Sequence, residues 1–367
     1  MIRLNEPYLF GNEKKFLLDC INSNWVASNG KYVEKFEEFI KKYIRTKYAQ
    51  SCINGTSALH LALKIIGVKK NDEVVLPAQT FLASAMAIKM VGAKPVFADI
   101  DFDTGNISID SIIDKISSKT KAIMPVHYGG NPCKLKEINN IARVNKLFVI
   151  EDAAQAFGAE YNNKIIGNIS DFTIFSFQAT KNLTTGDGGL ICSKNKKNYF
   201  ETQKKRWFGI NRRNSKISFL GERIFDLKDI GYKYHMNDIA AAIGIGNLLN
   251  YKKNLKLKRQ IANHYYKNLN NIDGINFLKI EKNSKSAYWL FPLLVNDRKN
   301  FIKKLRSHNI PVSVVNSGVD KFSIFGGVQN NLVNQRSFDK HQVCLPIHCS
   351  LSKHDLKKIC DTILSGW

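Results

Sequence analysis

The stretch "DFTIFSFQATKNLTTGDGGLICS", residues 171–193, places a single lysine between two short apolar runs. The runs at 171–177 and 189–193 are rich in Phe, Ile and Leu and are bounded by polar residues, which predicts two buried strands. Lys181 lies in the connection, among hydroxyl residues and just before a glycine cluster. A lysine at such a junction usually has a solvated amine. The rest of the chain must therefore supply the evidence for any function of Lys181.

Strands and helices alternate on both sides of this stretch. Helical patterns at residues such as 56–66 and 81–92 separate further short runs that are apolar on both faces. These runs, each predicted to be a strand, are 73–77, 94–100, 121–126 and 146–152. Strands of this kind, separated by amphipathic helices, indicate a mainly parallel sheet covered on both faces, which is an α/β fold.

The chain has 367 residues, which is enough for a large domain and a smaller one. The pattern at 236–269 predicts one long helix that leaves the sheet and leads into the second unit. A strand is predicted at 286–295 in that unit. We therefore expect a large domain at 1–250 and a small C-terminal α+β domain at 251–367.

Composition excludes several classes of protein. Hydrophobic residues make up 44% of the chain, which excludes a disordered protein. No apolar run reaches eighteen residues and the start of the chain lacks the apolar core of a signal peptide, so we expect a soluble cytoplasmic protein. The seven cysteines form no CxxC pair and the histidines are scattered, which predicts reduced thiols and no metal site.

The net charge of +24 has three possible explanations. The segment 194–216 alone carries nine Lys or Arg residues against one Glu. Such a segment can bind nucleic acid, attract an anionic small substrate, or be a solvated face. No helix-turn-helix, zinc-finger or RNA-recognition pattern accompanies it, so charge alone does not choose between the three.

Ligands of open α/β sheets lie beyond the carboxyl ends of the strands. Three polar segments of this chain are predicted to lie there. Gly55, Thr56 and Ser57 open a helix, whose positive end can hold a phosphate or can simply be capped. Asp152 ends an apolar run, and a buried carboxylate there needs a partner. Asp152 could cap the next helix, or it could pair with a cationic ring nitrogen.

The third segment holds Lys181 itself. A lysine beside apolar strands can have a lowered amine pKa, which makes the amine a nucleophile toward an aldehyde. A phosphate cradle, a buried acid and a nucleophilic lysine are together the elements of a pyridoxal 5'-phosphate site. In this order along one chain, the three predict that cofactor.

The chain resembles the DegT-type sugar-nucleotide aminotransferases, a branch of the fold-type I pyridoxal phosphate enzymes and thus of the aspartate aminotransferase superfamily. The resemblance runs through most of the first 250 residues and thins beyond residue 300. The stretches that carry it include "NGTSALHLAL", "PAQTFLASAMAI", "VIEDAAQAFGAEY", "SFQATKNLTTGDGG" and "GYKYHMNDIAAAIG". It implies a seven-stranded, mainly parallel sheet and a homodimer whose active sites are shared between the subunits.

The resemblance also implies roles for individual residues. Lys181 would be the catalytic lysine bound to the cofactor, and Asp152 the partner of the pyridine nitrogen. Gln155 would lie near the phenolic oxygen and Phe81 on the ring face. The phosphate would be held by Gly55, Thr56, Ser57 and Ser176, with Asn237 reaching the phosphate of the neighbouring subunit. Contacts with the substrate are expected from Trp25, His127, Gln178 and Arg212.

The predicted function is transfer of an amino group from an amino acid, L-glutamate, to a keto-sugar, most simply a nucleotide-linked one. It would proceed by ping-pong transamination through a Lys181 aldimine, as in routes to polysaccharides. Alternatives are a pyridoxal phosphate lyase or dehydratase, an aminotransferase acting on a non-nucleotide phosphorylated ketone, and a non-catalytic regulatory or nucleic-acid-binding protein. This chain departs from its relatives at two places. Many relatives carry an aromatic residue or His where this chain has Gln178, and relatives often carry a "HYP" segment that reaches the sugar where this chain has "PVSVVNSGVDKFSIFGG" (311–327), so the acceptor sugar stays open.

Overall fold

A seven-stranded sheet forms the centre of the molecule in a computed structural model, which describes residues 2–9, 11–211 and 215–367. The strand order is β1-β9-β8-β5-β4-β2-β3, and β9 alone runs antiparallel to its neighbours. The strands are β1 (Ala49–Cys52), β2 (Glu73–Pro77), β3 (Lys94–Ala98), β4 (Thr120–Ile123), β5 (Phe148–Asp152), β8 (Phe172–Ser176) and β9 (Gly189–Ser193). The predicted α/β fold with a mainly parallel seven-stranded sheet is confirmed.

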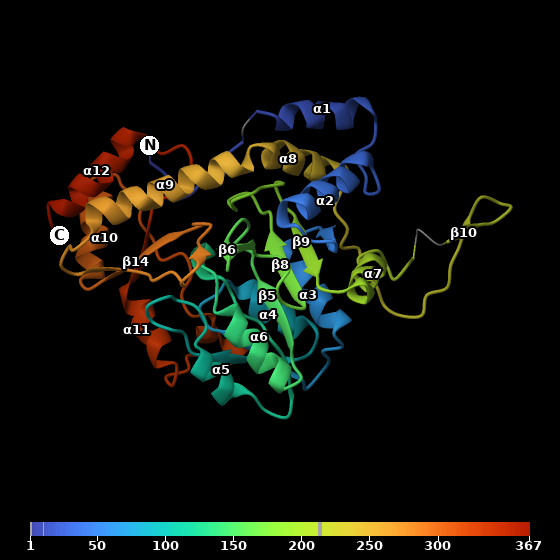
Figure 1. Ribbon diagram of the computed structural model, residues 1–367, viewed down its shortest axis with the longest axis horizontal. Coiled ribbons are helices and arrows are strands. Elements are labelled where there is room, and N and C mark those ends of the chain that lie inside the picture. The colour runs from blue at the N-terminus through green and yellow to red at the C-terminus, as the bar shows by residue number, and fades with distance from the viewer. Residues whose placement is uncertain (1, 10, 212–214) are drawn as a thin grey trace.

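Helices cover both faces of the sheet because successive strand residues point to opposite sides. Val74, Ile150 and Ile174 pack into one core with α3 (Gly55–Ile65) and α4 (Leu82–Met90). The residues after them, Val75 and Phe175 among others, pack into a second core on the other face. The helices of that face are α2 (Lys31–Ile44), α5 (Ile109–Lys115), α6 (Leu135–Val144) and α8 (Asp238–Leu249). α1 (Glu13–Asn22) lies on α8, and α7 (Lys196–Lys205) follows β9 (Figure 1).

A smaller α+β unit has its own core, to which α9 (Tyr251–Leu269), the long helix at the upper left of Figure 1, contributes. Its sheet order is β12-β14-β15. The elements are β12 (Ile275–Phe277), β14 (Phe291–Val295), α10 (Arg298–Ser307), α11 (Val333–His341), β15 (Gln342–Leu345) and α12 (Lys353–Leu364). The division into domains at residue 250 stays a prediction.

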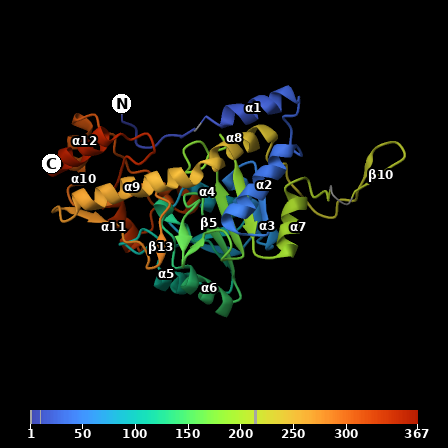
Figure 2. The same cartoon turned by 45° about the horizontal axis from the view of Figure 1, so that its top comes forward.

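Two short sheets complete the described structure. β6 (Glu160–Tyr161) pairs with β7 (Lys164–Ile165) and with β13 (Ser284–Lys285), which ties the large sheet domain to the small unit. β10 (Lys216–Ile217) and β11 (Arg223–Ile224) form a hairpin. This hairpin projects away from the body of the molecule in both views (Figures 1 and 2).

Two sequence predictions about secondary structure are wrong. The expected single helix at 236–269 is two helices, because Asn250 has φ −107° and ψ 5° and separates α8 from α9. The expected strand at 286–295 is a strand only over Phe291–Val295, since Tyr288 has a left-handed backbone conformation (φ 46°) that interrupts the extended chain. β1 was not predicted, because "AQSC" is short and not strongly apolar.

The first residues of the chain do not stay with the sheet domain. The backbone N–H of Ile347 donates to the carbonyl of Leu4 (3.0 Å), and a ring nitrogen of His348 lies 3.0 Å from the carbonyl of Arg3. The first described residues, from Ile2 on, therefore lie beside the small unit near α12 and the C-terminus, as Figures 1 and 2 both show. This segment spans from the small unit toward α1 and passes the functional site.

The seven cysteines are all free thiols, six of them buried. Their reduced state stays a prediction. Among the described residues, no helix combines the length and the apolar character needed to cross a membrane.

Candidate active site

A cavity of about 460 Å³ lies at the carboxyl ends of β5 and β8, beside the start of α3. This is the end of a parallel sheet at which α/β proteins bind ligands. The sequence-predicted residues that line it are Gly55, Thr56, Phe81, Asp152, Gln155, Ser176, Gln178 and Lys181. They come from four separate segments of the chain, which the parallel sheet brings to one edge.

Lys181 projects into this cavity from a compact loop between β8 and β9. The loop closes because the N–H of Phe177 donates to Gly188 (2.8 Å) and the N–H of Thr185 donates to Phe177 (2.9 Å). The Lys181 Nζ lies 3.5 Å from the centre of the Trp289 ring. Burial lowers the pKa of the Lys181 amine to about 8, and the charge of Asp152 acts in the opposite direction.

The Asp152 carboxylate is buried and held in one orientation. Its Oδ2 accepts from Ser84 Oγ (2.6 Å), and its Oδ1 accepts from the N–H of Ala154 (3.1 Å). Gln155 is fixed as well, because its Oε1 accepts from the N–H of Gly129 (2.7 Å). The cavity thus holds a preoriented acid opposite a buried amine.

The start of α3 forms a cradle of backbone N–H groups. Asn54 caps the helix by accepting from the N–H of Ser57 (2.8 Å). A Cβ on Gly55 would lie 3.0 Å from Ser176 Cβ, and a Cβ on Gly189 would lie 2.4 Å from the backbone of Asn54. Glycines therefore let β8 and β9 approach the helix end closely, at the place where an anion is bound best. Ser57 is buried, and unlike Thr56 it does not line the cavity.

Other predicted site residues lie elsewhere. His127 is fully buried behind the cavity, with its Nε2 3.0 Å from Glu151 Oε2 and its Nδ1 accepting from the N–H of Cys133 (3.0 Å). Trp25 and Asn237 line a different cavity, and Asn237 Oδ1 caps α8 by accepting from Ala240 N–H (2.9 Å). Arg212 lies outside the described residues.

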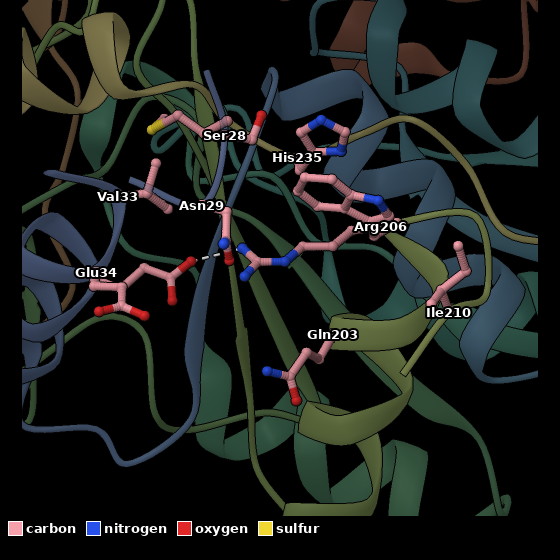
Figure 3. Close-up of a pocket in the computed structure, with 11 residues that line it drawn as sticks. Ser28, Asn29, Val33, Glu34, Gln203, Arg206, Ile210 and His235 are labelled. Carbon is pink, nitrogen blue, oxygen red and sulfur yellow. Dashed lines mark hydrogen bonds and ion pairs between the residues drawn. The ribbon is translucent and has the colours of Figure 1, made fainter. Parts of the chain in front are cut away.

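Arg206, one of the basic residues of 194–216, has a structural partner. Its Nη1 lies 2.6 Å from Glu37 Oε1 and donates to the carbonyl of Ser51 (2.6 Å). Figure 3 shows the guanidinium extending across a small pocket, with a dashed line to its partner. Burial opposes ionisation of Glu37, but Arg206 holds the pKa of Glu37 below its ordinary value. Arg206 therefore cannot serve as a substrate ligand without leaving a buried carboxylate unpaired.

Several residues of the site had no detectable pattern in the sequence. Trp289 and Asn316 line the cavity from the small unit, more than one hundred residues beyond Lys181. Ser84 lies inside an ordinary helix, and its spacing gave no indication that it would bind Asp152. Only the packing of distant segments brings these residues to the cavity.

A second buried lysine lies directly behind the loop. The Lys258 Nζ on α9 donates to Asn182 Oδ1 (2.8 Å), and Asn182 Nδ2 donates to the carbonyl of Ala287 (2.7 Å). Burial lowers the pKa of Lys258 to about 8, against a smaller opposing effect of Cys349. The loop that carries Lys181 is therefore anchored to the helix that leads into the small unit.

Comparison with known proteins assigns the chain to a family. Residues 8–364 match the model of the DegT/DnrJ/EryC1/StrS aminotransferase family. The chain is 34% identical to the GDP-perosamine synthase of Escherichia coli O157:H7, over 99% of this chain and 97% of that protein. The sugar aminotransferase CalS13 of Micromonospora echinospora has a similar structure, with a TM-score of 0.94, 29% identity and full coverage of both chains. The protein Spr1654 of Streptococcus pneumoniae, solved in a PLP-form, gives a TM-score of 0.91 at 26% identity, covering 99% of this chain and 98% of that one.

The chain belongs to the DegT/DnrJ/EryC1/StrS aminotransferase family and is an enzyme of the sugar aminotransferase type. The predicted family, enzyme class and pyridoxal phosphate cofactor are confirmed. The alternative of a non-catalytic regulatory or nucleic-acid-binding protein is not supported. The geometry fits the cofactor, because the cradle at α3, the fixed Asp152 and the buried amine of Lys181 line one cavity.

The close approach at Gly189 gives a test of the cradle. We expect Gly189→Ala to weaken binding of pyridoxal phosphate at least tenfold, because its Cβ would push β9 away from Asn54 and Gly55. Gly67→Ala, at the other end of α3, is the control: its φ of +80° costs stability but a Cβ there meets nothing within 4 Å. Equal affinity for the cofactor in Gly189→Ala and wild type, by titration of the absorbance, would contradict the assignment.

Lys258 gives a pH-dependent test of the anchor. Its pKa is about 8 in the folded chain and 10.5 ordinarily, so the unfolded chain binds more protons between these values. The contribution of Lys258 to the free energy of unfolding therefore rises from pH 8 to pH 10.5. In denaturant unfolding, the free energy of unfolding of wild type minus that of Lys258→Met should therefore become more positive from pH 8 to pH 10.5. The difference for Lys256→Met, an exposed lysine on the same helix, should stay constant. A constant difference for Lys258→Met as well would show that its amine is not buried.

Proposed function

We propose that the chain transfers an amino group from L-glutamate to a nucleotide-linked keto-sugar, in two half-reactions at the Lys181 cavity. The observation that carries this proposal is the buried Lys181 amine, which shares one cavity with Asp152 and the α3 cradle. Bound pyridoxal phosphate supplies an electrophilic carbon and an electron sink. The chain supplies binding, orientation and proton transfer.

Each part of the cavity has a proposed task. The N–H groups at the start of α3, with Thr56 and Ser176, would bind the phosphate. Asp152 would accept a hydrogen bond from the protonated ring nitrogen and keep that proton in place. Gln155 would lie beside the phenolic oxygen and Phe81 on the ring face. Both roles follow the family resemblance, and both side chains line the cavity.

Lys181 would act as the general acid and base. With the amino donor bound, the freed Nζ would take a proton from the carbon that carries the donor's amino group and would return it on the other side of the amino nitrogen, at the electrophilic carbon of the cofactor. A base is most useful when its pKa is near the working pH, and burial brings the amine of Lys181 to about 8. An exposed lysine would stay protonated at neutral pH and could not accept this proton.

A nucleotide-linked acceptor is supported by two observations. The E. coli relative is named GDP-perosamine synthase, after a GDP-linked amino sugar. Among the described residues that line the cavity, Lys181 is the one Lys, Arg or His. The cavity itself therefore suits an uncharged sugar ring, and a diphosphate would extend toward the basic surface outside, where the net charge of +24 attracts it.

We further propose a homodimer in which a second copy completes each site. Trp25, Phe208, Lys233 and Asn237 line a separate cavity of about 660 Å³ on an exposed face, and half of the Trp25 surface is open to water. The same face includes Ile53, the residue before the α3 cap. The projecting hairpin around β10 and β11 adds exposed apolar side chains, including a fully exposed Phe219. Exposed apolar side chains gathered on one face are typical of an interface, and a second copy on the face that includes Ile53 would approach the phosphate cradle.

Steady-state kinetics test the reaction. With GDP-perosamine and 2-oxoglutarate, the reverse reaction should give glutamate, and double-reciprocal plots at several 2-oxoglutarate concentrations should be parallel. Lys181→Ala should lower kcat by about 10²- to 10⁴-fold, which is the usual contribution of a general acid–base group. Lys256→Met, with an exposed lysine on α9, should retain wild-type activity.

The other outcomes identify the alternatives. Steady release of a deaminated product from glutamate without an acceptor would indicate lyase chemistry. Faster turnover of a panel of phosphorylated ketones than of nucleotide-linked sugars would move the acceptor to that class. Intersecting lines would contradict two separate half-reactions.

A further inference from the structure

The indole of Trp289 covers the amine of Lys181. The Nζ lies 3.5 Å from the centre of the ring, and Trp289 is 7% exposed. Both side chains line the same cavity. The face of an indole carries negative electrostatic potential and attracts ammonium groups more strongly than Phe or Tyr does, most of all where water is excluded.

The ring is fixed to the segment that carries the lysine. Trp289 Nε1 donates to the carbonyl oxygen of Thr180 (2.9 Å), the residue directly before Lys181. The backbone next to Lys181 therefore fixes the position of the ring, although Trp289 lies 108 positions further along the chain. Because the indole N–H is engaged at the ring edge, the face of the ring stays directed at the amine.

The N-terminal segment closes this arrangement. Asn5 Nδ2 lies 3.2 Å from the carbonyl of Thr180 and 3.3 Å from the carbonyl of Trp289, and donates toward both. Asn5 Oδ1 accepts from the N–H of Glu6 (2.9 Å), which sets the orientation of the amide. The segment is itself held on the small unit through Leu4 and Ile347. One amide thus joins three distant parts of the chain at the lysine.

We propose that the face of the Trp289 ring receives the ammonium form of Lys181 whenever the amine is released from the cofactor, and that Asn5 is the positioning residue that keeps ring and loop together. This inference rests on the proposed acid–base role of Lys181. The released amine needs such a partner, because Asp152 would then be engaged by the ring nitrogen of the cofactor. A neutral aromatic face stabilises the ammonium without holding its proton as tightly as a carboxylate would.

The charged groups around Lys181 are few among the described residues. Asp152 on β5 and Asp187 in the same loop line the cavity, and burial raises the pKa of Asp187 above its ordinary value. On the far side of the loop, Lys258 contacts Asn182. These groups are unaltered when only the electron density of the indole is changed, so the ring can be tested separately from them.

Fluorinated tryptophans provide the test, since they weaken the potential over the ring face while nearly keeping its shape. The full-length protein, stripped of cofactor, is prepared with tryptophan or with its mono-, di- or trifluoro forms. The reaction of Lys181 with limiting acetic anhydride is followed by mass spectrometry across pH. We expect the midpoint pH of this reaction to fall stepwise with each fluorine, by about 0.5 to 1 unit in total.

Three variants separate the ring from the other indoles and from Asn5. In Trp289→Phe the midpoint should not depend on fluorination, whereas Trp367→Leu, which removes an indole near the C-terminus, should keep the wild-type dependence. Asn5→Ala should reduce the dependence, and it should add no further shift in the Trp289→Phe background.

A midpoint that does not respond to fluorination in wild type would overturn the role of Trp289. If Asn5→Ala shifted the midpoint pH of the Lys181 reaction equally in wild type and in the Trp289→Phe background, the positioning role of Asn5 would be overturned. The measurement needs neither cofactor nor substrate. Failure of the inference therefore leaves the proposed transamination standing, and an inactive wild-type enzyme leaves the titration valid.

Discussion

The Lys181 amine lies in a cavity that also holds the Asp152 carboxylate, with the Trp289 ring 3.5 Å away. Lys181 is half-buried, and withdrawing an amine from water is costly, so this arrangement persists only because the surroundings fix it. The sheet supplies Asp152, the β8–β9 loop supplies the lysine, and Asn182 ties that loop to Lys258 on α9. A buried amine with a pKa of about 8 is the result, and the chemistry proposed for the cavity depends on it.

Much of this could be predicted from sequence because the relevant signals are local. Short apolar runs separated by helical patterns gave the parallel sheet, and polar residues at the ends of the runs gave Asp152 and Lys181. Local patterns could not give Trp289, Asn5 or Ser84, because each contacts the site through the packing of segments far apart in the chain. The helix break at Asn250 cannot be predicted for another reason: neither Gly nor Pro stands at the break to signal it in the sequence.

The site also shows how one small residue can serve two elements. Gly189 belongs to the only strand that runs antiparallel in the described sheet, and its missing side chain lets that strand touch the start of α3. His127 illustrates the opposite case, since both ring nitrogens of this buried histidine are used in structural contacts, one with Glu151 and one with the N–H of Cys133. Residue type and position alone did not separate these roles, whereas burial and partners do.

The most direct measurement is the absorption spectrum of the purified protein, reconstituted with pyridoxal phosphate, before and after addition of L-glutamate. We predict a visible band that disappears with glutamate and that never forms in Lys181→Ala. The absence of such a band in wild type, even with excess cofactor, would contradict a covalent role for the buried lysine. A band that glutamate leaves unchanged would contradict glutamate as the amino donor.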